Sequence, residues 1–259
     1  MSASRFVDEL AGLIAASHRI VAFTGAGAST GSGVPDLAGT NQILRADRGF
    51  SGSVFSLLDP GMAQRNPSEF YRLYRRTFFQ PQAVPNATHR VLAELERLGR
   101  LIGVVTMNVD FLHQEAGQRT VAEYWGDVRD NRCASCGARC DWRRLVHEEV
   151  PRCQSCGGVM LPDFVLRSLA PYPDQMRRGR QMLANGDLAL VVGTRQIPEG
   201  LRRDARLAVV CQGVGDVRGA DLVCGDEPAE DVFAALERDL PFSLLNPVAG
   251  SSPSDSHQR

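Results

Sequence analysis

Residues 19–36 read RIVAFTGAGASTGSGVPD, an apolar run that passes directly into a glycine-rich stretch. The apolar part has the length of a buried strand, and the glycines after it predict a tight turn that opens a helix. Gly25, Gly27 and Gly31 would let backbone N–H groups approach a pyrophosphate at the N-terminus of that helix. Turns of this kind also serve as simple connections, so the stretch alone indicates a dinucleotide site without establishing one.

The alternation of strand and helix patterns continues along the chain. A helix is predicted near Phe6, further strands at residues 101–106, 188–193, 206–211 and 221–224, and further helices at 86–98 and 229–240. Strands that alternate with helices predict an α/β fold with a mostly parallel sheet covered on both faces. The length of 259 residues, 43% of them hydrophobic, suits one large domain with a small insert.

Three segments lie outside this pattern. Residues 41–80 read as a helical insert, and residues 131–160 carry most of the cysteines. Residues 246–259 hold little that could enter a core, which predicts a mobile tail.

Composition narrows the possible partners and the location. A formal net charge of −1 gives no reason to expect a nucleic-acid partner. No apolar run approaches the roughly 20 residues needed to span a bilayer, so no membrane partner is expected and the predicted location is cytoplasmic. All 29 basic residues are arginine, and the protein therefore has no lysine side chain of its own to be acetylated.

The cysteines predict a metal site. Two C-x-x-C pairs are formed by Cys133, Cys136, Cys153 and Cys156. Four thiolates from two tight turns complete a closed tetrahedron around zinc, which is the arrangement of a structural zinc ribbon. A catalytic zinc would need an exchangeable ligand, which Cys140 or His147 could supply, and this stays the less favoured alternative.

The glycine stretch also resembles a family signature. GAGASTGSGVPD is similar to the sirtuin string GAGxSxxSGxPD, and sirtuin-like segments follow in the family's order, namely PNATHRVLAELERLG, TMNVDFLHQEAG, the paired cysteines, LPDFVL, LVVGT and ADLVCGDEPAEDV. The resemblance runs from about Phe6 to Leu240. It implies a Rossmann-type domain formed by residues 1–40, 81–130 and 161–245. It also implies a small domain of helical insert and zinc ribbon, with a cleft between the domains for NAD and an acyl-lysine peptide.

The resemblance also assigns cofactor-binding residues. By position these are Gly25, Ala26, Gly27, Ser29, Pro35, Asp36, Met107, Asn108, Val109, Asp110, Gly193, Thr194, Arg195, Gln212 and Asp226. Residues 25–29 would hold the phosphates, and Asp110 would accept a hydrogen bond from the nicotinamide carboxamide. Gly193 and Thr194 would lie beside the adenosine ribose. His89 and His113 also match family positions, and we interpret them as packed, hydrogen-bonded histidines rather than proton carriers.

The chain departs from the family at the catalytic histidine. Active sirtuins carry Glu-Leu-His-Gly before the first zinc cysteine, whereas this chain has Glu123, Tyr124, Trp125 and Gly126. An indole has one N–H donor and no basic nitrogen, so Trp125 cannot accept the ribose proton. Losing a positioned acid or base typically costs about a hundred- to ten-thousandfold in rate. The catalytic positions are therefore Asn108, Asp110 and the altered Trp125, in a divergent, bacterial-type member of the family.

Other replacements fall in the same predicted cleft. Met107 stands for a Gln, Leu37 and Ala38 for a Phe-Arg pair, Arg167, Ser168 and Leu169 for Phe-Gly-Glu, and Arg195 for a Ser. Arg167 and Arg195 would bring planar forks suited to phosphate or carboxylate, or they are simply exposed arginines.

Three functions remain open at this point. The favoured one is NAD cleavage with ADP-ribosyl transfer or atypical deacylation. A second is a non-catalytic protein that senses NAD or an ADP-ribose-containing ligand, or that binds a peptide or protein in the cleft. The third is ordinary NAD-dependent deacetylation, against which Trp125 counts.

Overall fold

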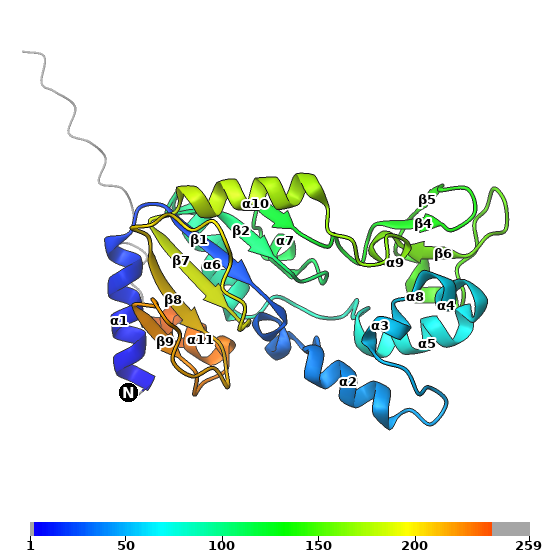
Figure 1. Ribbon diagram of the computed structural model, residues 1–259, viewed down its shortest axis with the longest axis horizontal. Coiled ribbons are helices and arrows are strands. Elements are labelled where there is room, and N and C mark those ends of the chain that lie inside the picture. The colour runs from blue at the N-terminus through cyan, green and yellow to red at the C-terminus, as the bar shows by residue number, and fades with distance from the viewer. Residues whose placement is uncertain (1–2, 240–259) are drawn as a thin grey trace, which may run out of the picture.

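The computed structural model describes residues 3–239, and its larger part is built on a six-stranded parallel sheet (Figure 1). The strand order is β3-β2-β1-β7-β8-β9. The strands are β1 Ile20–Thr24, β2 Leu101–Thr106, β3 Val121–Glu123, β7 Leu188–Val192, β8 Arg206–Val210 and β9 Leu222–Cys224. The predicted parallel sheet is confirmed. The pattern missed β3, which is only three residues long. The predicted tail at residues 246–259 lies outside the described residues.

Helices cover both faces of the sheet. They are α1 Ala3–Ala16, α6 Ala87–Arg97, α7 Leu112–Glu115, α10 Pro173–Asn185 and α11 Ala229–Asp239. Ile20 and Ala22 point into the core shared with α1, α6 and α11, whereas Val21 and Phe23 point into the core shared with α10. Because alternate side chains of one strand enter different cores, β1 is buried on both faces. No described helix combines the length and apolarity needed to cross a membrane.

The glycine stretch forms two short 3-10 turns rather than the start of an α-helix. These turns are η1 Ala26–Ala28 and η2 Thr30–Ser32, and the α-helix α2 begins only at Leu37–Ala46. Gly33 takes a left-handed conformation with φ 85° at the end of η2, which ends that turn. The side chain of Asp36 then caps α2 by accepting a hydrogen bond from the Gly39 N–H at 2.7 Å.

A smaller module lies beside the sheet (Figure 1). It contains α3 Val54–Leu57, α4 Pro60–Arg65, α5 Pro67–Thr77, α8 Arg144–His147 and α9 Asp163–Leu166, with β4 Asn131–Cys133, β5 Arg139–Cys140 and β6 Met160–Pro162. The three strands form an antiparallel sheet in the order β5-β4-β6.

The insert and the zinc ribbon share one core. Phe70, Tyr71 and Tyr74 of α5 are fully buried, and they pack in one cluster with Leu145 and Val159 of the ribbon. The Tyr71 hydroxyl also donates a hydrogen bond to the Met160 carbonyl. These contacts join segments far apart in sequence into one module, while the domain bounds stated above remain predictions.

Candidate functional site

The glycine turn packs directly against the end of β7. The N–H of Gly25 donates to the Val192 carbonyl at 3.0 Å, and the N–H of Gly27 donates to the Gly193 carbonyl at 2.9 Å. A Cβ on Gly25 would lie 2.7 Å from the Thr194 Cβ, and one on Gly27 would lie 2.9 Å from the Gly193 Cα. The two glycines are therefore required by packing between strands, independently of any ligand.

A buried hydrogen-bond network lies beside this turn. The Ser29 hydroxyl donates to Asp110 Oδ2 at 2.7 Å, and the Asn108 amide donates to Ser29 Oγ and to the Gly25 carbonyl, both at 3.1 Å. The Leu112 N–H donates to the second Asp110 oxygen at 3.0 Å. Burial raises the pKa of Asp110, and these donors act against that shift. The network orients the carboxyl group of Asp110 at the carboxyl end of β2.

Two histidines pack behind the network. His89 Nε2 lies 3.3 Å from Ser29 Oγ, and His89 Nδ1 receives the Asn86 N–H at 3.3 Å. His113 Nε2 lies 2.9 Å from Thr24 Oγ1. Burial lowers the pKa of His89 to about 4 and holds the pKa of His113 well below its usual range. Both rings are therefore neutral near pH 7, which agrees with their interpretation as packed histidines.

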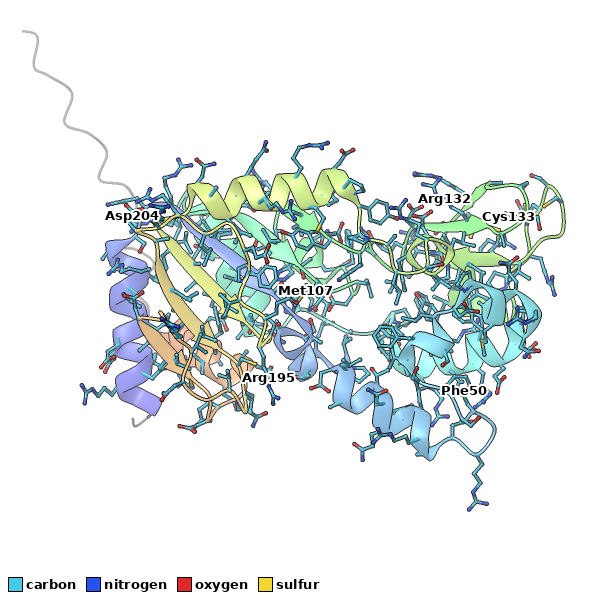
Figure 2. All side chains as sticks on the ribbon, in the orientation of Figure 1. Phe50, Met107, Arg132, Cys133, Arg195 and Asp204 are labelled. Carbon is cyan, nitrogen blue, oxygen red and sulfur yellow. The ribbon has the colours of Figure 1, made fainter. Side chains whose placement is uncertain are left out.

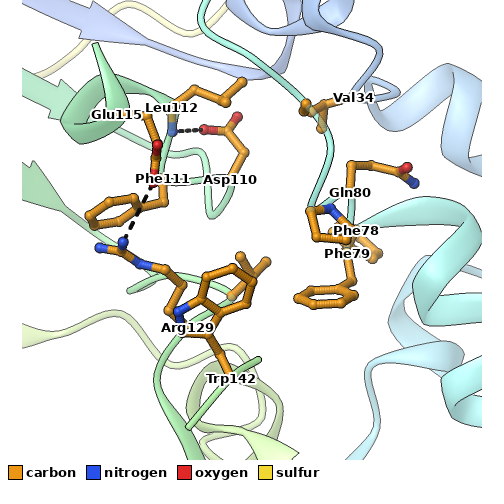
Figure 3. Close-up of a pocket in the computed structure, with 13 residues that line it drawn as sticks. Val34, Phe78, Phe79, Gln80, Asp110, Phe111, Leu112, Glu115, Arg129 and Trp142 are labelled. Carbon is orange, nitrogen blue, oxygen red and sulfur yellow. Dashed lines mark hydrogen bonds and ion pairs between the residues drawn. The ribbon is translucent and has the colours of Figure 1, made fainter. Parts of the chain in front are cut away.

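A cavity of about 190 Å³ opens from Asp110 toward the small module (Figure 3). Its lining consists of Val34, Phe78, Phe79, Gln80, Pro81, Ala83, Asp110, Phe111, Leu112, Glu115, Val128, Arg129 and Trp142. The Arg129 guanidinium lies over the Phe111 ring and 3.7 Å from the Glu115 carboxylate. The cavity walls are thus aromatic, with charged groups on the side of the sheet.

Trp125 contributes packing and does not line this cavity. It is partly buried and, together with Met107, packs against the apolar core between the sheet and α10. The terminal carbon of Met107 lies 3.2 Å from where a Cβ on Gly25 would stand. Both replacements therefore put apolar side chains where the resemblance predicts groups that handle the ribose.

The other predicted cofactor residues are spread around the sheet edge. Val109 packs against the small-module core, and Asp36 is occupied as the cap of α2. Arg195, Gln212 and Asp226 are exposed in the loops that follow β7, β8 and β9. The carboxyl ends of parallel strands bring these loops to one edge, as expected for a doubly wound sheet.

The sequence patterns did not predict an acidic cluster near the hydrogen-bond network of Asp110. Glu123 ends β3 beside Thr106 of β2. Its pKa is raised to about 7, first because burial disfavours the charged form and next because the Asp127 carboxylate is close, with a smaller effect from Asp110. Arg129 counteracts this shift in part. No local motif marks such a cluster, because its members meet only in the folded chain.

Glu123→Gln is expected to flatten the pH dependence of stability. The folded pKa lies above the ordinary value of 4.5, so the folded state binds this proton more tightly than the unfolded state. The contribution of Glu123 to the free energy of unfolding is therefore present below about pH 4.5 and is lost as the pH rises through about 7. At pH 8 the Gln variant should be more stable than the wild type by about 1–3 kcal/mol.

Urea unfolding at pH 5.5 and pH 8 measures this difference. The matched control is Glu94→Gln, because Glu94 pairs with Arg97 at the surface and its pKa is lowered. Each variant is compared with the wild type at the same pH, so any effect of pH on metal binding cancels from the difference in stability. The same pH dependence in Glu123→Gln as in the wild type would contradict the assignment.

The four predicted cysteines form one cluster in the small module. Their Sγ atoms all lie within 4.8 Å of one another, with Cys133 and Cys156 3.4 Å apart and Cys136 and Cys153 3.6 Å apart. Tetrahedral zinc with Zn–S bonds of 2.3 Å needs sulfur atoms about 3.8 Å apart, so the cluster fits the ion. Cys140 and His147 do not belong to the group, so among residues 3–239 neither of these side chains acts as a further ligand. Figure 2 shows Cys133 in the small module, remote from Met107, which directly follows β2.

Known proteins match this chain both in sequence and in structure. The Sir2 family model matches residues 25–197. An NAD-dependent protein deacetylase of Clostridium perfringens is 35% identical over 190 residues, covering 73% of this chain and 78% of the relative. One of Cutibacterium acnes is 37% identical over 188 residues, covering 72% and 77%. A solved structure of Sir2 with a p53 peptide and NAD⁺ is 27% identical, with a TM-score of 0.71 and coverage of 90% and 97%.

Proposed function

This chain belongs to the Sir2 family, and from that membership we propose that it is an NAD-dependent transferase. It would break the bond between nicotinamide and ribose in NAD and join the ribose to a nucleophilic acceptor or water, whose proton passes to solvent. The observation that carries this proposal is the intact Ser29, Asn108 and Asp110 network in a chain that has an indole, at Trp125, in place of the family's histidine. The network can orient nicotinamide for departure, whereas Trp125 cannot serve as the base of ordinary deacetylation.

The residues present fit an NAD-type ligand. Asp110 would accept a hydrogen bond from the carboxamide N–H, because its carboxyl group is already fixed by Ser29 and Leu112. Bond cleavage needs this orientation and electrostatic support more than it needs a base. A peptide or protein acceptor would enter through the cavity between Asp110 and the small module, where Phe79 and Trp142 offer apolar walls.

The backbone of the turn offers one free donor to the pyrophosphate. Within residues 25–29, the N–H groups of Gly25, Gly27, Ala28 and Ser29 all donate to backbone carbonyls. The N–H of Ala26, the first residue of η1, has no acceptor within the described chain. We assign the phosphate contact of this segment to Ala26.

Ala26→Pro is expected to weaken NAD binding by about ten- to a hundredfold, the cost of one hydrogen bond to a charged group. Proline removes only the N–H, since it fits the first position of a helical turn and Gly25 already has the extended backbone that proline requires before it. Ala26→Ser is the matched control, because it keeps the N–H. Calorimetry with NAD and ADP-ribose measures the effect. Equal affinity of the two variants would contradict the assignment of the phosphate contact to the Ala26 N–H.

Nicotinamide release tests the proposed reaction. The wild type should release nicotinamide from NAD slowly without deacetylating an acetyl-lysine peptide. The packing of Trp125 in an apolar core also favours a second candidate, a non-catalytic NAD or ADP-ribose sensor, which would bind NAD and release nothing. Release together with deacetylated peptide would support the third candidate, ordinary deacetylation. Absence of binding by NAD and ADP-ribose at millimolar concentration would defeat the proposal.

A further inference from the structure

Residues 167–172 connect α9 of the small module to α10, which covers the sheet (Figure 1). Ser168 and Leu169 in this connection both have left-handed backbone, with φ 53° and 58°. A left-handed residue other than glycine costs about 1–2 kcal/mol. The N–H groups of both residues donate to carbonyl groups of α9 at 2.9 Å, which holds this backbone in place. The connection therefore leaves α9 in one fixed direction, starting from Arg167.

The Arg167 guanidinium is held near position 125 by an aromatic ring. It lies over the Tyr172 ring, 4.3 Å from the ring centroid. The hydroxyl side of the same ring packs against Gly126, where a Cβ would lie 2.9 Å from Tyr172 Cε2. The Tyr172 N–H donates to the Tyr124 carbonyl at 2.8 Å. Tyr172 thus contacts the residues on both sides of Trp125 and carries Arg167 on its face.

No carboxylate of the described chain neutralises Arg167. Its guanidinium takes part in no ion pair among residues 3–239, and its Nε is buried without a hydrogen-bond acceptor there. Its one hydrogen bond to those residues runs from Nη2 to the Pro171 carbonyl at 3.3 Å. The carboxylate of Asp163 is already engaged, because it accepts from the Tyr172 hydroxyl and pairs with Arg132 at 2.7 Å. Since a buried donor without an acceptor costs free energy, Arg167 is suited to an anion from outside the chain.

The indole at position 125 favours an acceptor that needs no base. A hydroxyl, an amine or water must lose a proton when it is joined to a sugar, and Trp125 cannot take that proton. A carboxylate is already ionised near pH 7 and has no proton to lose. Carboxylates attack the sugar carbon directly in retaining glycosidases. An arginine fork binds a carboxylate through two parallel hydrogen bonds, so both features favour the same acceptor.

We propose that Arg167 binds the carboxylate of a glutamate or aspartate side chain in a peptide or protein, and that this carboxylate accepts the ADP-ribosyl group. The inference rests on the proposed function and names its acceptor. A carboxylate oxygen forms a bond to the ribose carbon while the bond from that carbon to nicotinamide breaks. The electron pair of the broken bond leaves with nicotinamide, no proton is transferred, and the product is an ester. Arg167 lies at the junction of the sheet and the small module, toward which the cavity beside Asp110 also opens.

Peptide modification in the presence of NAD tests this acceptor. Each peptide of one pool carries a single glutamate or aspartate, and the matched pool carries glutamine or asparagine there. Mass spectrometry should find ADP-ribose on the acidic pool alone, and hydroxylamine, which cleaves esters, should remove it. Arg167→Gln should lower the ratio of modified peptide to released nicotinamide by about ten- to a hundredfold, as expected for hydrogen bonds to a charged group. Arg167→Lys, which keeps the charge without the fork, should retain only part of that ratio.

Arg202→Gln is the matched control, because Arg202 pairs with Asp204, which Figure 2 shows far from Arg132 of the small module. This variant should keep the wild-type ratio. Equal modification of the two pools, or an unchanged ratio in Arg167→Gln, would overturn the inference and leave the proposed function standing. Absence of nicotinamide release with every peptide and with water would defeat both.

A succinyl-lysine peptide separates two sources of the carboxylate. Its binding is measured by calorimetry with the wild type and with Arg167→Gln. Binding that depends on Arg167, together with nicotinamide release that leaves the acidic pool unmodified, would assign Arg167 to an acyl carboxylate. That result would also overturn the inference.

Discussion

Trp125→His alone is expected to give little or no deacetylation of an acetyl-lysine peptide. The new imidazole would replace an indole that packs against the apolar core between the sheet and α10, so it would sit beside apolar neighbours and leave a cavity. Met107 would still occupy the ribose side with a thioether, which cannot support the hydroxyl groups. Catalytic groups that act as a unit are strongly non-additive, so one restored member recovers little.

Trp125→His combined with Met107→Gln and Ala38→Arg should deacetylate measurably faster, by about tenfold or more over the single variant. Ala38 is exposed in the first turn of α2, so arginine can be placed there without disturbing a core. Nicotinamide and deacetylated peptide are followed together, because the first reports bond cleavage and the second reports completed transfer. The control adds Asp110→Asn to the triple variant and should remove both products. Robust deacetylation by the unmodified protein would refute this interpretation and require another proton acceptor.

Replacing Cys153 or Cys156 with serine is expected to unfold the small module while the parallel sheet stays folded. Structural zinc contributes about 10–16 kcal/mol to the folding of small metal domains, so loss of one ligand removes several kcal/mol. The damage should spread into the insert, because Tyr71 is bonded to the Met160 carbonyl and the two segments share one core. The sheet has separate cores on its two faces and does not depend on the metal.

Metal analysis and circular dichroism check this result. The wild type should carry one zinc per chain, and the near-ultraviolet signal of the buried tyrosines Tyr71 and Tyr74 should disappear at a lower temperature in the variants. The far-ultraviolet signal of the sheet should persist. Cys140→Ser is the matched control, because Cys140 lies in the ribbon but outside the cluster, and it should keep its zinc. Zinc well below one per wild-type chain, or loss of all structure in a single step, would contradict the prediction.

Local patterns were sufficient for five of the six sheet strands and for the metal cluster. The strands at residues 101–106 and 188–193 are continuous apolar runs, which is how strands buried on both faces read in a sequence. The paired cysteine spacing encodes two tight turns, each of which presents two thiolates, so four close sulfur atoms follow from spacing and sheet pairing. Family membership follows from short motifs that occur in a fixed order. These motifs remain recognisable when single residues are replaced.

Only the tertiary structure decided how the site is arranged. Ser29 and Asp110 are 81 positions apart, and their hydrogen bond exists because the parallel pairing of β1 and β2 brings both strand ends to one edge. At the same edge the N–H groups of Gly25 and Gly27 donate to the end of β7, and those of Ala28 and Ser29 donate within the turn, which leaves the N–H of Ala26 for a ligand. The raised pKa of Glu123 likewise depends on burial, which no spacing reveals. Sequence determines what each segment can form by itself, whereas contacts between distant segments depend on packing of the whole chain.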